Sequence, residues 1–113
     1  MESQLELLDE IRKCTAKVRQ ELPDTMAAHD AFRDEVYKDG ALNHKVKRLI
    51  ALGIALRAGC TACIIYQTKL AVEAGATKAE VLEAVSVAIA LGGTPAIGWS
   101  WRVVKVLEEL GKW

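Results

Sequence analysis

The stretch KVKRLIALGIALRAGCTAC, residues 45–63, decides how the rest of the chain is interpreted. Its first part predicts a helix that Asn43 can cap and that runs to about Ala58. From Leu49 to Leu56 this helix is apolar on every side. A helix that is apolar all round is normally buried, so we expect it to lie centrally in the fold. Gly59 then breaks it.

Cys60-Thr61-Ala62-Cys63 opens the next helix, which ends at Ala74-Gly75. The first turn of a helix carries unpaired N–H groups and a partial positive charge, and both favour a thiolate over a thiol. One helical turn brings Cys60 and Cys63 to the same face, within reach of a disulfide. Such a pair can attack a peroxide or a disulfide with one sulfur and resolve the product with the other. Because the helix field fades within one turn, we expect Cys60 to be the more thiolate-prone sulfur.

The cysteine pair could also serve a purely structural role. Both sulfurs could be inert core residues, the pair could form a static disulfide, or it could belong to a structural zinc site. A zinc site needs four ligands, and the remaining candidates, Cys14, His29 and His44, offer no second paired spacing. We therefore expect no metal and no other cofactor. Cys14 is expected to be a small core residue and His29 a surface residue.

Helical periodicity continues upstream, and no segment shows the alternation typical of a strand. An amphipathic helix is predicted from about Glu2 to Glu21. Pro23-Asp24 punctuates the chain, and a second helix then runs to the glycine stop at Lys38-Asp39-Gly40.

Two more helices are predicted downstream. Thr77 begins a capping-box sequence, and its helix ends at Gly92-Gly93. Thr94 is expected to cap the last helix, with Pro95 at its first position and Gly111 at its end. The sequence therefore predicts an all-α, six-helix bundle that forms a single domain over residues 1–113, with the Cys-x-x-Cys motif at the N-terminus of a central helix.

Composition limits the classes of function. Fifteen basic residues balance fifteen acidic ones, so no overall field attracts nucleic acid or anionic lipid. The N-terminal residues lack a secretory signal pattern, and Gly92–Pro95 cuts the uncharged run Ala84–Trp101 into halves too short to span a membrane. Three cysteines without an export signal favour a reducing, cytoplasmic location. A domain of 113 residues buries little surface on its own, which makes self-association plausible.

Residues 45–67 resemble the carboxymuconolactone decarboxylase family, specifically its AhpD-like alkylhydroperoxidase branch. The likeness continues through residues 71–84 and 90–95 and spans roughly residues 41–110. It implies an all-α fold whose subunits commonly assemble into trimers or hexamers. It also implies a dithiol–disulfide cycle at Cys60 and Cys63 that reduces hydroperoxides.

The proton relay of the AhpD-like enzymes is not matched. They usually have Glu twelve residues before the first cysteine, where this chain has Arg48, and His four residues after the second, where it has Gln67. AhpD itself also has His at the position of Ala62. Gln67 cannot shuttle a proton at neutral pH and Arg48 cannot act as a base, although its charge could stabilise a thiolate. His44 is the nearest substitute acid or base, with simple exposure as the alternative.

The leading hypothesis is a thiol–disulfide oxidoreductase, at most a weak alkylhydroperoxidase-like peroxidase, that cycles Cys60 and Cys63. Its substrate would be a small hydroperoxide or disulfide, and its electron donor an unidentified thiol. Tyr66, Arg57 and Glu83 are further candidates to line the site. The alternative is a redox-inactive oligomeric binding or scaffold protein of the same fold, which the missing relay favours. Carboxymuconolactone decarboxylation ranks third, because that branch typically uses the His that Gln67 replaces.

Overall fold

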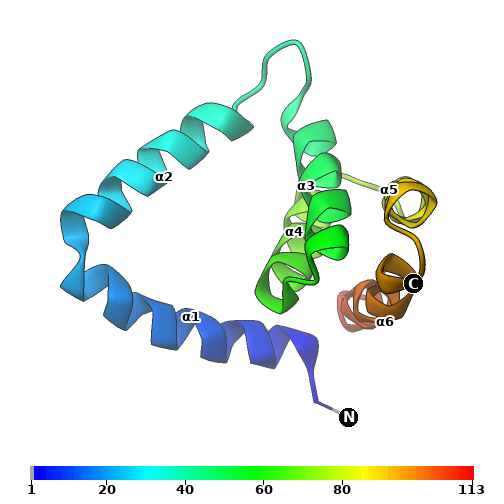
Figure 1. The fold of residues 1–113 in the computed structure, drawn as a ribbon, viewed down its shortest axis with the longest axis horizontal. Coiled ribbons are helices and arrows are strands. Elements are labelled where there is room, and N and C mark those ends of the chain that lie inside the picture. The colour runs from blue at the N-terminus through cyan, green and yellow to red at the C-terminus, as the bar shows by residue number, and fades with distance from the viewer. Residues whose placement is uncertain (1) are drawn as a thin grey trace.

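The computed structural model describes residues 2–113, and within them the chain forms six helices and no strand (Figure 1). The predicted all-α fold is therefore confirmed. The helices are α1 (Gln4–Glu21), α2 (Pro23–Tyr37), α3 (His44–Ala58), α4 (Thr61–Glu73), α5 (Lys78–Gly92) and α6 (Thr94–Glu109).

Most helices begin where the sequence supplies a cap. The side chain of Asn43 accepts from the N–H of Val46, and Thr77 forms the predicted capping box with Glu80. The cap predicted for α6 is wrong: Thr94 is already helical and Gly93 precedes it without a side-chain hydrogen bond. The reason is that only one residue, Gly93, separates α5 from α6. It turns the chain at φ 73°, a backbone angle that favours glycine.

Helices α3, α4, α5 and α6 enclose the main core. Its fully buried side chains include Leu52, Leu56, Ile64, Val81, Val103 and Leu107. Helices α3 and α5 run parallel. Lys45 pairs with Glu80 at 2.8 Å at their first turns, and Arg57 packs on Gly92 at their last turns.

Helix α3 lies centrally, as expected, because it contacts α4, α5, α6 and, near its start, α2. It is nevertheless not buried on every side. Its outer side exposes Ile50 and Ile54, and the neighbouring side of α5 exposes Val87 and, at 92%, Leu91. We call this surface the α3–α5 groove. It has a volume of about 820 Å³ and a small-residue floor of Gly53, Ala84 and Ala88.

The N-terminal helices extend away from this bundle as an arm formed by the second half of α1 and all of α2 (Figure 1). The first half of α1 packs through Leu8 against Ile65 and Val106. Beyond it α2 has no buried residue, and the arm exposes Val18, Leu22, Phe32 and Val36. Cys14 lies in the exposed part of α1, so its expected core position is wrong. The reason is that the apolar stripe of α1 continues beyond the part of this helix that other helices cover.

Glu109, at the end of α6, ties the start of α1 to the bundle. Its carboxylate accepts hydrogen bonds from the hydroxyl of Ser3 at 2.7 Å, the N–H of Gln4 at 2.7 Å and the N–H of Leu5 at 3.0 Å. Partial burial opposes ionisation, but these three donors outweigh it and lower the pKa of Glu109. A carboxylate on the first N–H groups of a helix is a favourable cap.

We expect Glu109→Gln to lower the free energy of unfolding at pH 7 by about 1 kcal/mol, the usual loss for a removed cap. Because the folded pKa is below the unfolded one, this contribution is present above the unfolded pKa of about 4.3 and is lost as pH falls through the folded value. Urea unfolding at pH 7 and pH 3 measures it. Glu108→Gln, at the exposed neighbouring residue, is the control, and equal effects of the two variants at pH 7 would contradict the prediction.

Candidate redox site

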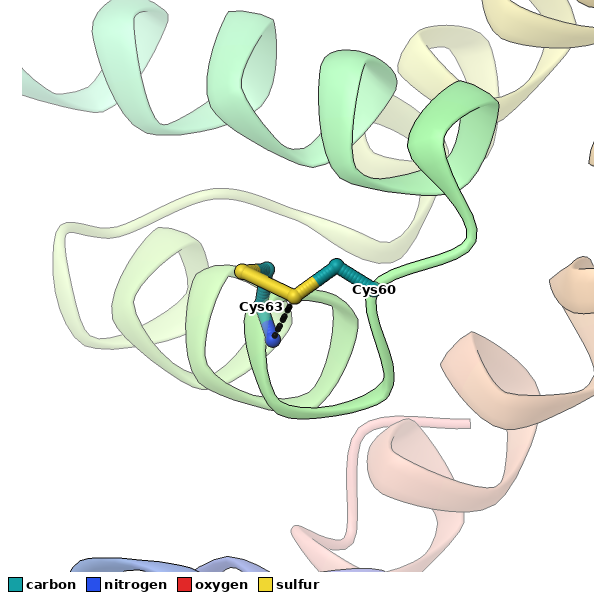
Figure 2. Close-up of a disulfide and its surroundings, with 2 residues drawn as sticks. All are labelled: Cys60 and Cys63. Atoms are coloured by element: carbon teal, nitrogen blue, oxygen red, sulfur yellow. Dashed lines mark hydrogen bonds between the residues drawn. A yellow bond between two sulfur atoms is a disulfide. The ribbon is translucent and has the colours of Figure 1, made fainter. Parts of the chain in front are cut away.

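The cysteine pair lies at the start of α4 (Figure 2). Cys60 and Cys63 are joined as a disulfide with Cα atoms 5.2 Å apart, within the usual range for such a bond. Cys60 occupies the N-cap position, and its sulfur accepts a hydrogen bond from the N–H of Cys63 at 3.3 Å. Sequence reasoning placed the pair at the helix start; the structure adds that the Cys60 sulfur itself is the cap.

The single residue Gly59 fixes how Cys60 enters α4. It ends α3 in the left-handed region at φ 70°, and its N–H and that of Cys60 both donate to the carbonyl of Ala55. The indole of Trp99 from α6 packs directly on it, since a Cβ at Gly59 would lie 2.9 Å from Nε1 of Trp99. Both the backbone angle and the packing therefore require glycine here.

The two cysteines differ in exposure. Cys60 is partly buried between the end of α3 and the start of α4, whereas Cys63 is exposed. Of the two residues, Cys63 is therefore the more accessible to solvent.

The two positions that would hold the relay in AhpD-like enzymes contact each other across α3 and α4. Nη1 of Arg48 donates to Oε1 of Gln67 at 3.2 Å. Gln67 lies one helical turn after Cys63, on the same face of α4. Neither group transfers protons at neutral pH, and their contact puts a positive charge where the relay would have an acid.

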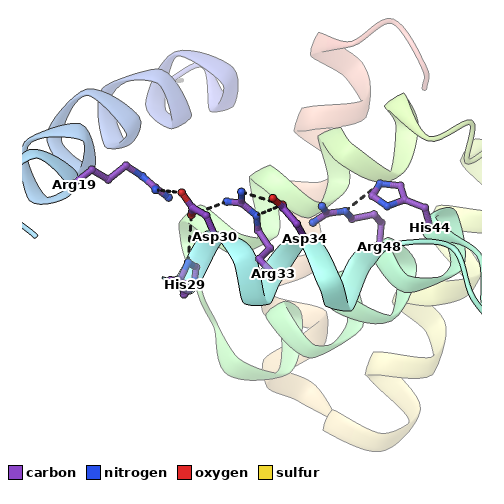
Figure 3. Close-up of polar contacts among 7 residues, drawn as sticks. All are labelled: Arg19, His29, Asp30, Arg33, Asp34, His44 and Arg48. Carbon is purple, nitrogen blue, oxygen red and sulfur yellow. Dashed lines mark hydrogen bonds and ion pairs between the residues drawn. The ribbon is translucent and has the colours of Figure 1, made fainter. Parts of the chain in front are cut away.

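His44 and Tyr37 hold Arg48 from the other side. Nε of Arg48 donates to Nε2 of His44 at 3.4 Å (Figure 3), and the guanidinium lies over the ring of Tyr37, 3.7 Å from its centre. Nδ1 of His44 faces the carbonyl oxygen of Tyr37 at 2.7 Å. The tautomer with the proton on Nδ1 satisfies both contacts, because Nδ1 then donates to Tyr37 and Nε2 accepts from Arg48.

The remaining predicted residues lie away from the cysteine pair. Tyr66 packs with the second core cluster beside α1, under the guanidinium of Arg12. Arg57 and Glu83 line the α3–α5 groove. His29 is exposed, as predicted. In residues 2–113 no three His, Cys, Asp or Glu side chains gather as metal ligands.

Sequence reasoning missed two residues that shape the site, Tyr37 and Trp99. Tyr37 ends α2 and covers Arg48, but nothing in its local spacing signals that contact. Trp99 comes from α6, forty residues beyond Gly59, so only tertiary packing reveals it.

Comparison with known proteins identifies the family. The sequence profile of the carboxymuconolactone decarboxylase family matches residues 23–106, which is most of the chain. The chain belongs to this family. Its Cys-x-x-Cys motif is consistent with the AhpD-like branch. The match begins within the arm, upstream of the part where the motif resemblance is clearest.

Solved structures and sequence relatives agree with this family. A carboxymuconolactone decarboxylase family protein from Legionella pneumophila has a TM-score of 0.93 at 30% identity, over 99% of this chain and all of its own. TM1620 from Thermotoga maritima has a TM-score of 0.81 at 31% identity, over 88% of this chain and 90% of its own. Uncharacterised protein 4 of the cox locus in Paracoccus denitrificans is 35% identical over 71% of this chain and 72% of its own.

The helices give no sign of a membrane span. In residues 2–113 none is both long enough and apolar enough to cross a bilayer.

We expect Gly59→Ala to lower the free energy of unfolding by about 2 kcal/mol, because it combines a left-handed backbone angle with a clash against Trp99. Gly98→Ala is the matched control: this helical glycine has open space around it, so alanine should stabilise by about 0.5–1 kcal/mol. Chemical denaturation of both variants measures the difference. A Gly59→Ala protein as stable as wild type would show that Trp99 does not constrain this turn.

Proposed function

We propose that this protein is a thiol–disulfide oxidoreductase that cycles Cys60 and Cys63 between dithiol and disulfide. The observation that carries the proposal is the hydrogen bond from the N–H of Cys63 to the sulfur of Cys60, at a helix N-terminus and beside an exposed partner sulfur. A static disulfide or a pair of core thiols needs neither the cap nor the exposure.

In the proposed cycle Cys63 meets the substrate and Cys60 resolves it. The Cys63 thiolate attacks one sulfur of a small disulfide, and the other sulfur leaves as a thiolate. Cys60 then attacks the Cys63 mixed disulfide, closes the protein disulfide and releases the second thiol. Two thiols of an electron donor reverse these steps. In this proposal the helix N-terminus stabilises the Cys60 thiolate, and the exposure of Cys63 makes it the cysteine that meets the substrate.

Hydroperoxide reduction is the finer form of this proposal. The Cys63 thiolate would attack the peroxide oxygen and become a sulfenic acid, the alcohol would leave, and Cys60 would close the disulfide and release water. The leaving oxygen needs a proton, and the positions of the family's relay hold Arg48 and Gln67, which do not supply one at neutral pH. We therefore rank disulfide exchange above peroxidase activity. An antioxidative role has been suggested for the Thermotoga maritima protein, which fits either form.

The alternatives rank lower. A redox-inactive scaffold of the same fold agrees with the missing relay but leaves the exposed, capped cysteine pair unexplained. Carboxymuconolactone decarboxylation ranks third, because Gln67 stands where that branch typically has its histidine. The cycle requires a reductant, so we propose a reducing compartment such as the cytoplasm, and one functional domain over residues 1–113.

We expect the oxidised wild type to lose its disulfide to excess 2-mercaptoethanol and to recover it with a small disulfide oxidant. Cys60→Ser should accumulate a stable mixed disulfide at Cys63, because its resolving sulfur is gone. Cys63→Ser should form mixed disulfides at least about tenfold more slowly, since Cys60 is partly buried. Thiol counting and mass spectrometry measure these reactions, with every protein carrying Cys14→Ser to remove the exposed third thiol.

Two results would contradict the proposal. One is a wild-type pair that reacts no faster than free cysteine in either direction. The other is faster trapping at Cys60 than at Cys63, which would reverse the assigned order of the sulfurs.

We also propose that the protein is a homo-oligomer in which the α3–α5 groove of one copy packs on that of another. Residues 49–56 of α3 are apolar on every side, which is typical of buried helices, yet Ile54 is 64% exposed and Leu91 on α5 is 92% exposed. With the exposed Ile50 and Val87 they form one continuous apolar surface, which is typical of an interaction site.

Two charged residues in the groove favour a second copy as the occupant. Glu83 lies in the second turn of α5, near its middle, and Arg57 lies in the last turn of α3. Neither forms an ion pair in residues 2–113. A twofold axis across the groove would make the two copies antiparallel and place Arg57 of each copy by Glu83 of the other. Twofold contacts need an even number of copies, so this favours the hexamer over the trimer.

We expect Leu91→Glu to lower the mass measured by light scattering after gel filtration, because it buries a charge in the contact. Ala90→Glu, on the same helix but outside the groove, should leave the mass unchanged. Arg57→Glu and Glu83→Arg should each weaken assembly, and the double variant should restore it. A wild type that is monomeric at about 100 μM would contradict the proposal. A double variant that assembles no more strongly than the single variants would refute the antiparallel arrangement.

A further inference from the structure

We propose that Arg48 forms an anion-binding subsite beside Cys63, so that the thiols and disulfides exchanging with the pair carry a carboxylate near their sulfur. This inference rests on the proposed function and names its substrate class. It depends on the surroundings of Arg48, not on the cysteines.

Arg48 is a buried charge without a counter-ion. The residue is only 7% exposed, and its contacts are all neutral: the amide oxygen of Gln67, the ring nitrogen of His44 and the ring of Tyr37. No carboxylate in residues 2–113 forms an ion pair with it. Asp39 is engaged with the backbone N–H of His44 at 2.6 Å. Buried guanidinium groups are normally paired, so this charge lacks the partner that an anionic ligand would provide.

The guanidinium of Arg48 is held in place and still has an unused hydrogen-bond donor. Gln67 and His44 engage Nη1 and Nε, which leaves Nη2 free of any hydrogen bond within residues 2–113. Nη2 of Arg48 is not among the fully enclosed side-chain atoms of residues 2–113 that lack a hydrogen bond, so the 7% of Arg48 that is exposed leaves it some contact with solvent. A carboxylate can accept from such a planar edge, and the stacking on Tyr37 keeps that edge from turning.

The residue that Arg48 contacts lies on the same face of α4 as the exposed cysteine. Gln67 follows Cys63 by one helical turn. A reagent whose carboxylate lies two or three bonds from its sulfur could therefore contact Arg48 while its sulfur meets that of Cys63. A neutral reagent would gain no such contact and would leave the buried charge unpaired.

The exchange itself balances without any further reactant. The reagent thiolate attacks the sulfur of Cys63, the Cys63–Cys60 bond breaks, and Cys60 takes the electron pair as a thiolate. A second reagent thiolate attacks the mixed disulfide, which releases the reagent disulfide and the Cys63 thiolate. Two reagent thiols are oxidised, the protein disulfide is reduced, and water supplies or takes up the protons.

The experiment measures how fast three thiols of similar size reduce the oxidised protein. They are 3-mercaptopropionate, 2-mercaptoethanol and cysteamine, which are negative, neutral and positive, and each rate is divided by the thiolate concentration. We expect wild type to prefer 3-mercaptopropionate to 2-mercaptoethanol by about tenfold and to disfavour cysteamine. Arg48→Met should abolish the preference, and Arg48→Lys should keep part of it as a point charge. Lys13→Met, which removes one exposed cation from α1, should retain it.

Each outcome has a defined meaning. Equal rates for the three thiols with wild type overturn the inference, whether or not Arg48→Met folds. A uniform loss of rate with all three thiols in Arg48→Met also overturns it, because the residue would then act on the protein sulfurs and not on the reagent's charge. Exchange with none of the thiols would instead refute the proposed function. A preference that Arg48→Met removes and Lys13→Met retains supports the inference.

Discussion

The arrangement of the site depends on the turn that joins α3 to α4. Gly59 ends α3 and Cys60 caps α4, so the junction contains no further residue whose backbone angles could adjust. Trp99 packs on Gly59, and the carbonyl of Ala55 accepts hydrogen bonds from the N–H groups of Gly59 and Cys60. The orientation of Cys60, and with it that of Cys63 one turn later, is consequently set by core packing.

The same scaffold presents a different electrostatic environment from the one that its family resemblance implies. A glutamate and a histidine would move protons between the substrate and the sulfurs, whereas Arg48 and Gln67 form a fixed hydrogen-bonded pair. His44 does not replace the missing base, because both of its ring nitrogens are already engaged, one by Arg48 and the other by the carbonyl of Tyr37. Chemistry that needs little proton transfer, such as exchange between thiolates and disulfides, suits this environment better than cleavage of an oxygen–oxygen bond.

Sequence reasoning recovered what depends on local signals. The caps at Asn43 and Thr77, the glycine stops and the cysteine pair act within one or two turns, and the observed helices begin and end close to them. Long-range contacts were out of its reach. Patterning could not tell that Tyr37 covers Arg48, and it placed Cys14 in the core because an amphipathic stripe does not reveal where its covering helices stop. The same limit explains why the all-round apolar stretch of α3 indicated its central position but not which of its sides stays exposed.

The arm makes the stability of the chain uneven. Helix α2 buries no residue, and apart from the turn at Pro23 it is held to its neighbours mainly by the ion pair of Arg19 with Asp30, at 2.7 Å, and by the contacts of Tyr37. The four bundle helices share one continuous core and must open together. In a single copy, the amide hydrogens of α2 would therefore exchange with solvent through local opening, at a small fraction of the free energy that unfolds α3 to α6. The cover over Arg48 comes from this loosely held element, so fluctuations of α2 would open and close one wall of the site.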